Sequence, residues 1–447
     1  MVFDSVTFLF RFFPVFMVAY YLIPKKGRNL LLFLGSLFVC SWGSGRTLLI
    51  LLLSVLTDYM CGLLLDNLRE KKSGKLVLLL ALCLNLWGLM FGAERSIVAL
   101  SFWAIHGISY CMDVYSGRTE SFMNPIHLGV YLTFFPVRMA GPILQYSDME
   151  AQIRHRSITP EHVKDGLKRI CFGLTKKVFL GDRCGALWGE ILHRGVENCS
   201  AGTAWLGAIA FLMWLYFTFS GYADLAVGLA KMLGFTIPEN FNCPVFSVSV
   251  TDFCSRFFCS VSAFLRRIGV GFLGMERRNI ILQCMMILLA GGAAGIWLQK
   301  SLSALLCGLF LAFFLCLEKM GLSRLLEALS KPIRMLYTDL IVLAAGVILG
   351  VSNVKLILPY GKSLLGLSGL VDREFFFLSE QYLVYLLAGA VVACGVLDRL
   401  ADKIRESRSG LGMAIYRFGE IAVPAVCLLW TLIWAVGTGY PEFVFSF

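Results

Sequence analysis

Long uninterrupted apolar runs limit what this chain can fold into more than any other feature of its sequence. They occupy residues 7–24, 29–43, 47–66, 75–93, 97–115, 125–145, 203–233, 280–298, 302–317, 335–357, 378–397 and 421–438. About 20 helical residues cross the hydrocarbon core of a bilayer, whereas a membrane β-barrel needs short segments that alternate apolar and polar residues. We therefore expect an all-α polytopic membrane protein. The runs predict about ten to twelve spanning or re-entrant helices, in a single domain over residues 1–447.

The composition agrees with a lipid environment. Hydrophobic residues make up 58% of the chain and charged residues 15%, whereas soluble domains carry about 25% charged residues. The segment before the first run has no basic residue, and no small-residue cleavage site follows that run. Because a secretory signal peptide has both features, we expect residues 7–24 to be retained as the first span.

The net charge of +11 is interpreted as a signal of membrane orientation, not of a nucleic-acid partner. Basic residues gather in two short loops, whereas the loop between them, residues 44–46, holds one arginine. The two groups are Lys25, Lys26 and Arg28, then Arg69, Lys71, Lys72 and Lys75. Since Lys and Arg mark cytoplasmic loops, we expect a cell-membrane protein whose N-terminus lies outside. Contacts with lipid headgroups explain most of these charges, and binding of an anionic cofactor is the alternative.

The fifteen cysteines do not form a recognisable framework. Seven lie inside apolar runs, namely Cys40, Cys61, Cys83, Cys111, Cys307, Cys316 and Cys394, and the sequence has no Cys-x-x-Cys pair. In such surroundings cysteine behaves as a small hydrophobic residue. We therefore expect no disulfide and no metal site.

Three polar segments interrupt the apolar pattern. Thr159 and Pro160 form a helix start, with threonine as N-cap and proline at the first position, and residues 163–180 are amphipathic, as in a helix at the membrane surface. Residues 243–267 are too polar to cross the bilayer simply and predict a re-entrant segment facing a cavity. Residues 358–373 are rich in glycine and predict an extramembrane loop.

Ionisable side chains within the apolar segments are candidates for function. The notable ones are Asp58, His106, Asp113, Asp224 and Glu239. Such groups are rare in lipid and mark functional sites or pairs between helices. For each one alone, a structural hydrogen bond to a neighbouring helix is the simpler interpretation.

The surroundings of these residues resemble one family in order and spacing. The most specific block covers residues 216–242, with Phe-Ser-Gly-Tyr at 219–222 and Pro-Glu-Asn-Phe-Asn at 238–242; Ser-Val-Thr-Asp-Phe follows at 249–253. Other matching blocks are Phe-Phe-Pro at 134–136, Ala-Gly-Pro-Ile at 140–143 and the closing residues 441–447. The chain thus resembles the membrane-bound O-acyltransferase family, in the bacterial branch of alginate O-acetyltransferases and teichoic-acid D-alanylation proteins.

The resemblance implies a helical basin with a thin floor at mid-membrane. An acyl-thioester donor, acetyl-CoA or an acyl carrier, would approach from the cytoplasm, and the acceptor hydroxyl from the other face. A histidine at the constriction would act as general base, since the pKa of imidazole lies near the operating pH. The expected product is an O-acylated, in particular O-acetylated, extracellular or cell-wall polysaccharide.

The residues that should perform this chemistry are replaced. Phe258 stands at the first family histidine and Leu298 at the principal one, next to the retained Trp297. Thr218 and Arg267 stand at two family acidic positions, and no histidine follows His193. Phenylalanine and leucine cannot accept a proton, so the resemblance predicts an impaired or inactive enzyme, a pseudoenzyme without an intact catalytic set.

The resemblance also implies which polar pocket residues persist. They are Tyr216, Ser220, Tyr222, Asp224, Glu239, Asn240, Asn242, Asp252, Arg256 and Trp297. One hypothesis is a family member kept for binding, for passage of an acyl group or as a scaffold. A second is an active acyltransferase with a substitute base, His106 above all, or Asp224, Asp252 or Glu239. A third is a transporter.

Partners follow from the same resemblance. We expect membrane lipid, and a polysaccharide-modification or acyl-carrier protein as partner, but no nucleic acid. No cofactor is expected to be bound permanently, and the acyl-thioester donor is expected only if activity persists.

Overall fold

The structure is a computed structural model. It describes residues 3–5, 7–92, 97–197, 199–272, 274–396, 399–400, 403–404, 419, 422–429, 431 and 433. Helices account for most of this part of the chain, and its one extended pairing is an isolated antiparallel bridge between Phe241 and Phe257. The prediction of an all-α polytopic membrane protein is confirmed, because six helical segments are long and apolar enough to cross a membrane. They are Gly45–Leu68, Ala201–Met232, Ile280–Leu298, Leu302–Glu327, Lys331–Gly350 and Arg373–Ala393, and two shorter apolar ones are Thr7–Leu22 and Pro125–Val137.

The described chain packs as two compact units that alternate along the sequence. The first unit comprises Met1–Ile170 and Tyr222–Pro238, and the second comprises Cys171–Gly221 and Glu239–Ser446. Helix α10 (Ala201–Met232) therefore contributes its first two thirds to the second unit and its last turns to the first.

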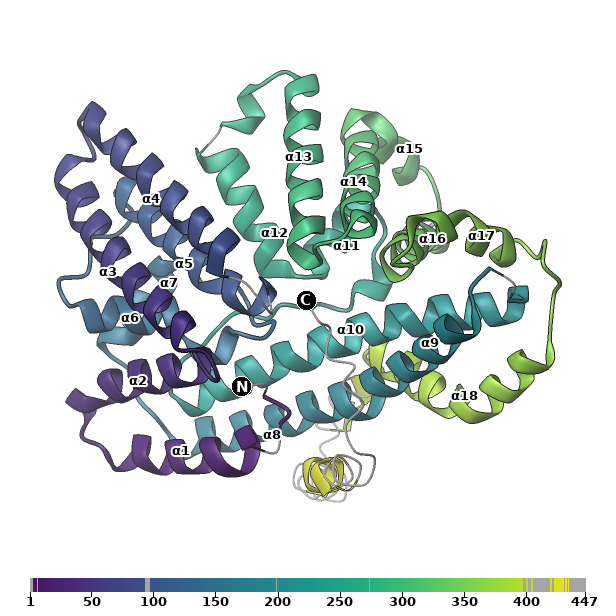
Figure 1. Ribbon diagram of the computed structural model, residues 1–447, viewed down its shortest axis with the longest axis horizontal. Helices are drawn as coiled ribbons and strands as arrows, with labels where there is room; N and C mark the ends of the chain where they lie inside the picture. The colour runs from purple at the N-terminus through teal and green to yellow at the C-terminus, as the bar shows by residue number, and fades with distance from the viewer. Residues whose placement is uncertain are drawn as a thin grey trace. The chain divides into compact units, whose positions relative to one another are not determined.

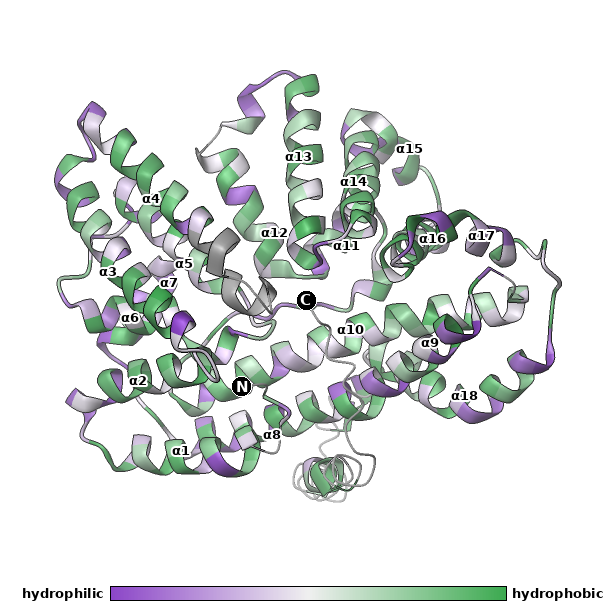
Figure 2. Cartoon of the chain, viewed as in Figure 1, coloured by the Kyte–Doolittle hydropathy of each residue, from purple (hydrophilic) through white to green (hydrophobic). Residues whose placement is uncertain are grey.

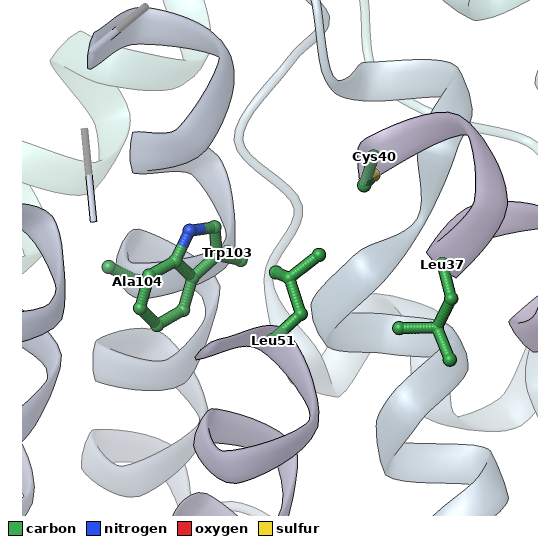
Figure 3. Close-up of a cluster of buried hydrophobic side chains, with 5 residues drawn as sticks. All are labelled: Leu37, Cys40, Leu51, Trp103 and Ala104. Carbon is green, nitrogen blue, oxygen red and sulfur yellow. The ribbon is translucent and has the colours of Figure 1, made fainter. Parts of the chain in front are cut away.

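The first unit runs from a short π-helical turn and α1 to the first part of α8, and it also includes the last turns of α10. Its α-helices are α1 (Phe13–Leu22), α2 (Arg28–Cys40), α3 (Gly45–Leu68), α4 (Lys72–Gly92), α5 (Ile97–Tyr115), α6 (Pro125–Thr133), α7 (Tyr146–Arg154) and α8 (Pro160–Thr175). Helices α3, α4 and α5 pack side by side, and α2 packs on α6 (Figure 1). Buried side chains from α2, α3 and α5 meet in one apolar cluster, drawn in Figure 3: Leu37, Cys40, Leu51, Trp103 and Ala104.

The second unit holds the remaining helices. They are α9 (Asp182–Arg194), the first part of α10, α11 (Val250–Arg256), α12 (Cys259–Arg266), α13 (Ile280–Leu298), α14 (Leu302–Leu317), α15 (Ser323–Glu327), α16 (Lys331–Gly350), α17 (Val354–Leu364) and α18 (Arg373–Ala393). Helices α13 and α14 form a hairpin in which glycines replace side chains. A Cβ on Gly295 would overlap the carbonyl oxygen of Ala304, and one on Gly308 would overlap that of Gly291. The two backbones are therefore in direct contact.

Several long helices carry apolar side chains on their outer surface. Ile281 and Leu289 of α13 are 70% and 72% exposed, and Figure 2 shows α3 and α13 hydrophobic over most of their length. In water such surfaces are unfavourable because apolar area is removed from water when it can be. Here they are the surfaces that lipid tails would cover.

The N-terminus of α10 is fixed by the segment that precedes α18. Asp372 caps α18 by accepting from the N–H of Phe375 at 2.7 Å, and it also accepts from the hydroxyl of Thr203 at 2.8 Å and the N–H of Ser200 at 3.2 Å. The hydroxyl of Tyr360 donates to the carbonyl of Ala204 at 2.7 Å. One carboxylate thus satisfies backbone and side-chain donors at the starts of two helices.

Local sequence signals give mixed results. The N–H of His162 donates to the Thr159 hydroxyl at 3.2 Å, and α8 begins at Pro160, which confirms the predicted helix start. The apolar run 125–145 is not one helix: α6 ends at Thr133, and Phe134 has an extended ψ of 96° before the short turn Phe135–Val137. Pro136 explains this break, because it lacks the N–H that would bond to the carbonyl of Leu132 one turn back, and its ring would clash with that carbonyl in a continuous helix.

The predicted loop over residues 358–373 is partly wrong. Helix α17 continues through Pro359 to Leu364, and only the residues after it form the connection to α18. Pro359 lacks the N–H that would bond one turn back, yet its fixed φ suits the helix. The glycines that suggested a loop lie mostly after this helix, with positive φ at Gly366 and Gly369.

Candidate functional site

The predicted re-entrant segment folds as two short helices, α11 and α12, joined at Phe257 and Phe258. Ser249 caps α11 by accepting from the N–H of Asp252 at 3.0 Å. The buried carboxylate of Glu318 accepts from the N–H groups of Val250 and Thr251 at 2.7 and 2.9 Å. Since the first N–H groups of a helix have no partner within it, Glu318 fixes the start of α11.

Phe258, which the resemblance aligns with the first family histidine, lies at the junction of the two helices. Its backbone is left-handed, with φ 56° and ψ 58°. Its ring centroid is 5.1 Å from that of Phe219 on α10, 5.1 Å from that of Phe241 and 5.2 Å from that of Phe257. These four residues are called the phenylalanine cluster below.

Polar residues around this cluster hold the backbone in place. The N–H of Asn242 donates to the carbonyl of Arg256 at 3.0 Å, and the N–H of Cys259 donates to the carbonyl of Asn240 at 2.9 Å. The side-chain oxygen of Asn240 accepts from both the N–H and the hydroxyl of Ser260, at 3.2 and 2.7 Å. Asn240 and the backbone of Asn242 therefore clamp residues 240–242 against the junction of α11 and α12.

The other expected pocket residues of the second unit are dispersed around this junction. Asp252 pairs with Arg256 one turn later at 2.7 Å, and the Tyr216 ring lies 5.9 Å from that of Phe241. Thr218 and Ser220 are buried on α10.

The remaining residues of the second unit that the resemblance singled out lie on other elements. Leu298 is the last residue of α13, directly after Trp297, and both are half-buried. Arg267 follows the last residue of α12 and is half-buried, whereas Glu239 is exposed.

Asp224 and Tyr222 belong to the first unit, on the last turns of α10. The Asp224 carboxylate is buried, and the guanidinium of Arg169 on α8 donates to its Oδ1 from Nε at 2.7 Å and lies 2.6 Å away at Nη2. Gly166 and Gly228 allow these helices to approach closely, because a Cβ on Gly228 would lie 2.6 Å from the carbonyl oxygen of Gly166. Asp224 is thus placed to join two helices.

His106 also belongs to the first unit, on α5. Its side chain is buried, its Nε2 accepts from the N–H of Leu144 at 3.2 Å, and its ring lies 5.1 Å from that of Tyr131. A neutral imidazole that accepts at Nε2 carries its proton on Nδ1. A cavity of about 20 Å³ adjoins the ring and is partly lined by Cys40, Leu51 and Trp103 of the apolar cluster in Figure 3.

Two ionic features were not recognised in the sequence. Glu318 was not among the candidate residues, yet it is buried and holds α11. Lys177 is buried, and its amine donates to Asp182 at 3.1 Å. The signal for Glu318 was a carboxylate directly after an apolar run, a position that charge avoids unless it has partners. Among the described residues, no three metal-ligating side chains gather into one group.

Comparison with known proteins shows which family this chain resembles in sequence. Residues 118–268 match the model of the membrane-bound O-acyltransferase family. The chain is 33% identical over 365 residues to the Pseudomonas fluorescens protein named "probable alginate O-acetylase", with 79% of this chain and 73% of that protein covered. It is 26% identical over 352 residues to the peptidoglycan O-acetyltransferase of Helicobacter pylori, covering 65% of this chain and 66% of that protein.

A third relative matches over a shorter part of the chain. The teichoic acid D-alanyltransferase of Bacillus subtilis is 28% identical over 176 residues, 38% of this chain and 44% of that protein. The helices define a polytopic helical membrane protein. The chain belongs to the membrane-bound O-acyltransferase family.

Proposed function

We propose that this chain is a non-catalytic member of its family that serves the O-acetylation of a cell-envelope polysaccharide at the cell membrane, as a binding or scaffold component. The family membership supports a role in O-acetylation. So do the names of two relatives, a probable alginate O-acetylase and a peptidoglycan O-acetyltransferase. The loss of both family histidines supports the non-catalytic role.

The phenylalanine cluster is the observation that carries this proposal. Where the resemblance expects an imidazole, the Phe258 ring is in contact with three other phenylalanine rings at 5.1 to 5.2 Å. A hydrocarbon ring has no lone pair to take the hydroxyl proton, and losing a general base typically lowers a rate by about 10²–10⁴. The cluster also makes this place apolar, which disfavours a hydroxyl acceptor and a developing oxyanion.

Three of the four candidate substitute bases are engaged in other bonds. His106 uses its Nε2 lone pair to accept from Leu144, so it would have to break that bond to take a proton. Asp224 is paired with Arg169, and Asp252 with Arg256. These bonds favour the non-catalytic proposal over an active enzyme.

The test is acetyl transfer by the purified full-length chain. Labelled acetyl-CoA is supplied with a polysaccharide acceptor, and the label is followed because the fifteen cysteines of the chain would react with a thiol reagent. We expect no transfer above the level without protein. Transfer that is abolished by His106→Gln in a folded protein would show an active enzyme with a substitute base and contradict the proposal.

A cellular experiment tests the supporting role. Deleting the gene is expected to lower the acetyl content of the envelope polysaccharide, and the His106→Gln variant is expected to restore it as fully as the natural chain does. Unchanged acetylation of the polysaccharide after deletion would contradict the proposed role in O-acetylation. If the natural chain restores the acetyl content but a folded His106→Gln variant does not, the result would support an active enzyme with His106 as base.

A further inference from the structure

The first unit contains a basic pocket that the family resemblance does not explain. It has a volume of about 680 Å³ and is lined on one side by the turn between α1 and α2 and on the other by the end of α7. Five of its lining residues are basic at neutral pH: Lys25, Lys26, Arg28, Arg154 and Arg156. None of the lining residues is acidic. Figure 2 shows hydrophilic residues at the turn that joins α1 to α2.

Two guanidinium groups of this pocket have buried donors without partners. The Nε of Arg28 and the Nη2 of Arg156 are both buried and have no hydrogen-bond partner among the described residues. A buried, charged donor that makes no hydrogen bond destabilises the folded protein, because it has lost its bonds to water without replacing them. Such a pair is therefore typical of a site whose ligand supplies the acceptors.

Arg156 is held in position for this role. Its Nε donates to the hydroxyl of Tyr20 at 3.0 Å, its Nη1 donates to the side-chain oxygen of Asn29 at 2.7 Å, and its guanidinium lies 4.5 Å from the ring centroid of Phe235. The Tyr20 hydroxyl in turn donates to the carbonyl of Leu233 at 2.9 Å. These contacts fix the guanidinium before any ligand arrives, which lowers the entropy lost on binding.

Membrane orientation alone does not account for the arrangement. Lysines and arginines that orient a loop act through their charge and need no common cavity. Among the described residues, the ion pair at this pocket joins Arg154 to Glu150 at 2.8 Å. The other four basic residues therefore converge on one cavity without an ion pair to any carboxylate that the structure describes.

We propose that this pocket binds a phosphate ester group. A phosphate offers several acceptor oxygens and up to two negative charges, and it matches the planar donors of arginine. A single carboxylate would leave most of the positive charge uncompensated. The volume is within the range of about 300–1,000 Å³ for small-ligand sites. The phosphate can belong to a soluble phosphorylated compound or to the headgroup of an anionic lipid, and the proposal does not depend on whether the chain transfers acyl groups.

Binding of inorganic pyrophosphate to the purified full-length protein tests the proposal. Arg28→Gln removes one unpartnered donor, and Lys25→Gln with Lys26→Gln removes two exposed charges that take no part in packing. Each variant is expected to weaken pyrophosphate binding about tenfold or more, the effect of losing one charge-assisted hydrogen bond. The control is Lys71→Gln with Lys72→Gln, two exposed lysines of the next basic loop, which changes the net charge equally and should bind as the natural chain does.

A second measurement identifies the source of the phosphate. The protein is reconstituted in bilayer discs of phosphatidylcholine, with or without phosphatidylglycerol. If phosphatidylglycerol displaces pyrophosphate, the ligand is a lipid headgroup; if it does not, the ligand is soluble. Absence of pyrophosphate binding in both bilayers, or equal binding by the two pocket variants and the lysine control, would overturn the proposal.

Discussion

Phe258 combines two features that sequence reasoning treats separately. The resemblance predicts that a histidine is replaced here, whereas the left-handed backbone at this position could not be predicted from the sequence. A left-handed conformation costs a residue with a Cβ about 1–2 kcal/mol, and ring contacts contribute about 0.5–1.5 kcal/mol each. The contacts with Phe219 and Phe241 come from distant parts of the chain. The packing of the phenylalanine cluster could therefore not be predicted from the sequence.

The backbone strain at Phe258 gives an unusual prediction. In most elements glycine is less stable than alanine, because it loses more conformational freedom on folding. At φ 56° the order should reverse, so Phe258→Gly is expected to be more stable than Phe258→Ala by about 1 kcal/mol. Thermal unfolding in detergent measures the difference. The same two substitutions at Phe10, an exposed helical position, serve as control and should keep the usual order.

At the scale of elements, some apolar runs predicted the first and last residues of a helix correctly. Runs 280–298 and 302–317 coincide with α13 and α14, because Asn279 and Ser301 cap them and polar residues end the runs. The run 125–145 failed because its residues remain apolar through a proline-induced break at Phe134. Hydrophobicity thus predicts where lipid or core lies, and helix ends depend on caps and prolines that act over one turn.

The glycine contact between α13 and α14 predicts a specific sensitivity. Gly295→Ala places a methyl group against the backbone of Ala304, so it should separate the two helices and lower the stability by about 1–3 kcal/mol. Gly361→Ala, in α17 where nothing lies within 4 Å of the new Cβ, is the control. It should leave stability unchanged or raise it by about 0.5–1 kcal/mol. Equal melting temperatures for the two variants would contradict the contact.

The cap at Asp372 predicts a pH-dependent contribution. Partial burial alone would raise the pKa of this carboxyl, but the hydrogen bonds from Phe375, Thr203 and Ser200 outweigh it and lower the pKa below its ordinary value of 3.8. The stabilisation is therefore present above pH 3.8 and is lost as the pH falls through the lower folded value.

Two substitutions at Asp372 separate the cap from the charge. At neutral pH, Asp372→Ala should lower stability by about 1 kcal/mol. The difference in unfolding free energy between Asp372→Ala and the natural chain should shrink at pH 3. Asp372→Asn keeps a cap oxygen without a charge, so the stability that this cap contributes should change little with pH. Thermal unfolding between pH 7 and pH 3 measures both. A constant difference between Asp372→Ala and the natural chain over this range would be inconsistent with the lowered pKa.

At the scale of the whole molecule, the charges predict an orientation that can be measured. Helix α3 has 24 residues, about 36 Å of helix, enough to cross the bilayer between the loop at residues 44–46 and the basic loop that begins at Arg69. An epitope inserted after Gly43 should be reached by antibody in sealed cells. One inserted after Lys71 should be reached only after permeabilisation, because basic loops stay in the cytoplasm. The reverse pattern would invert the predicted topology.

The bond from the Tyr20 hydroxyl to the carbonyl of Leu233 spans 213 residues. At a synthesis rate of about 5–20 residues per second, the first helix must wait about 10–40 s before its acceptor has left the ribosome. During that interval the α1 segment is in the membrane without its native neighbour, and its hydrogen-bonding hydroxyl must find a temporary acceptor. The contact between α1 and this acceptor can therefore form only after that interval, late in the synthesis of the first unit.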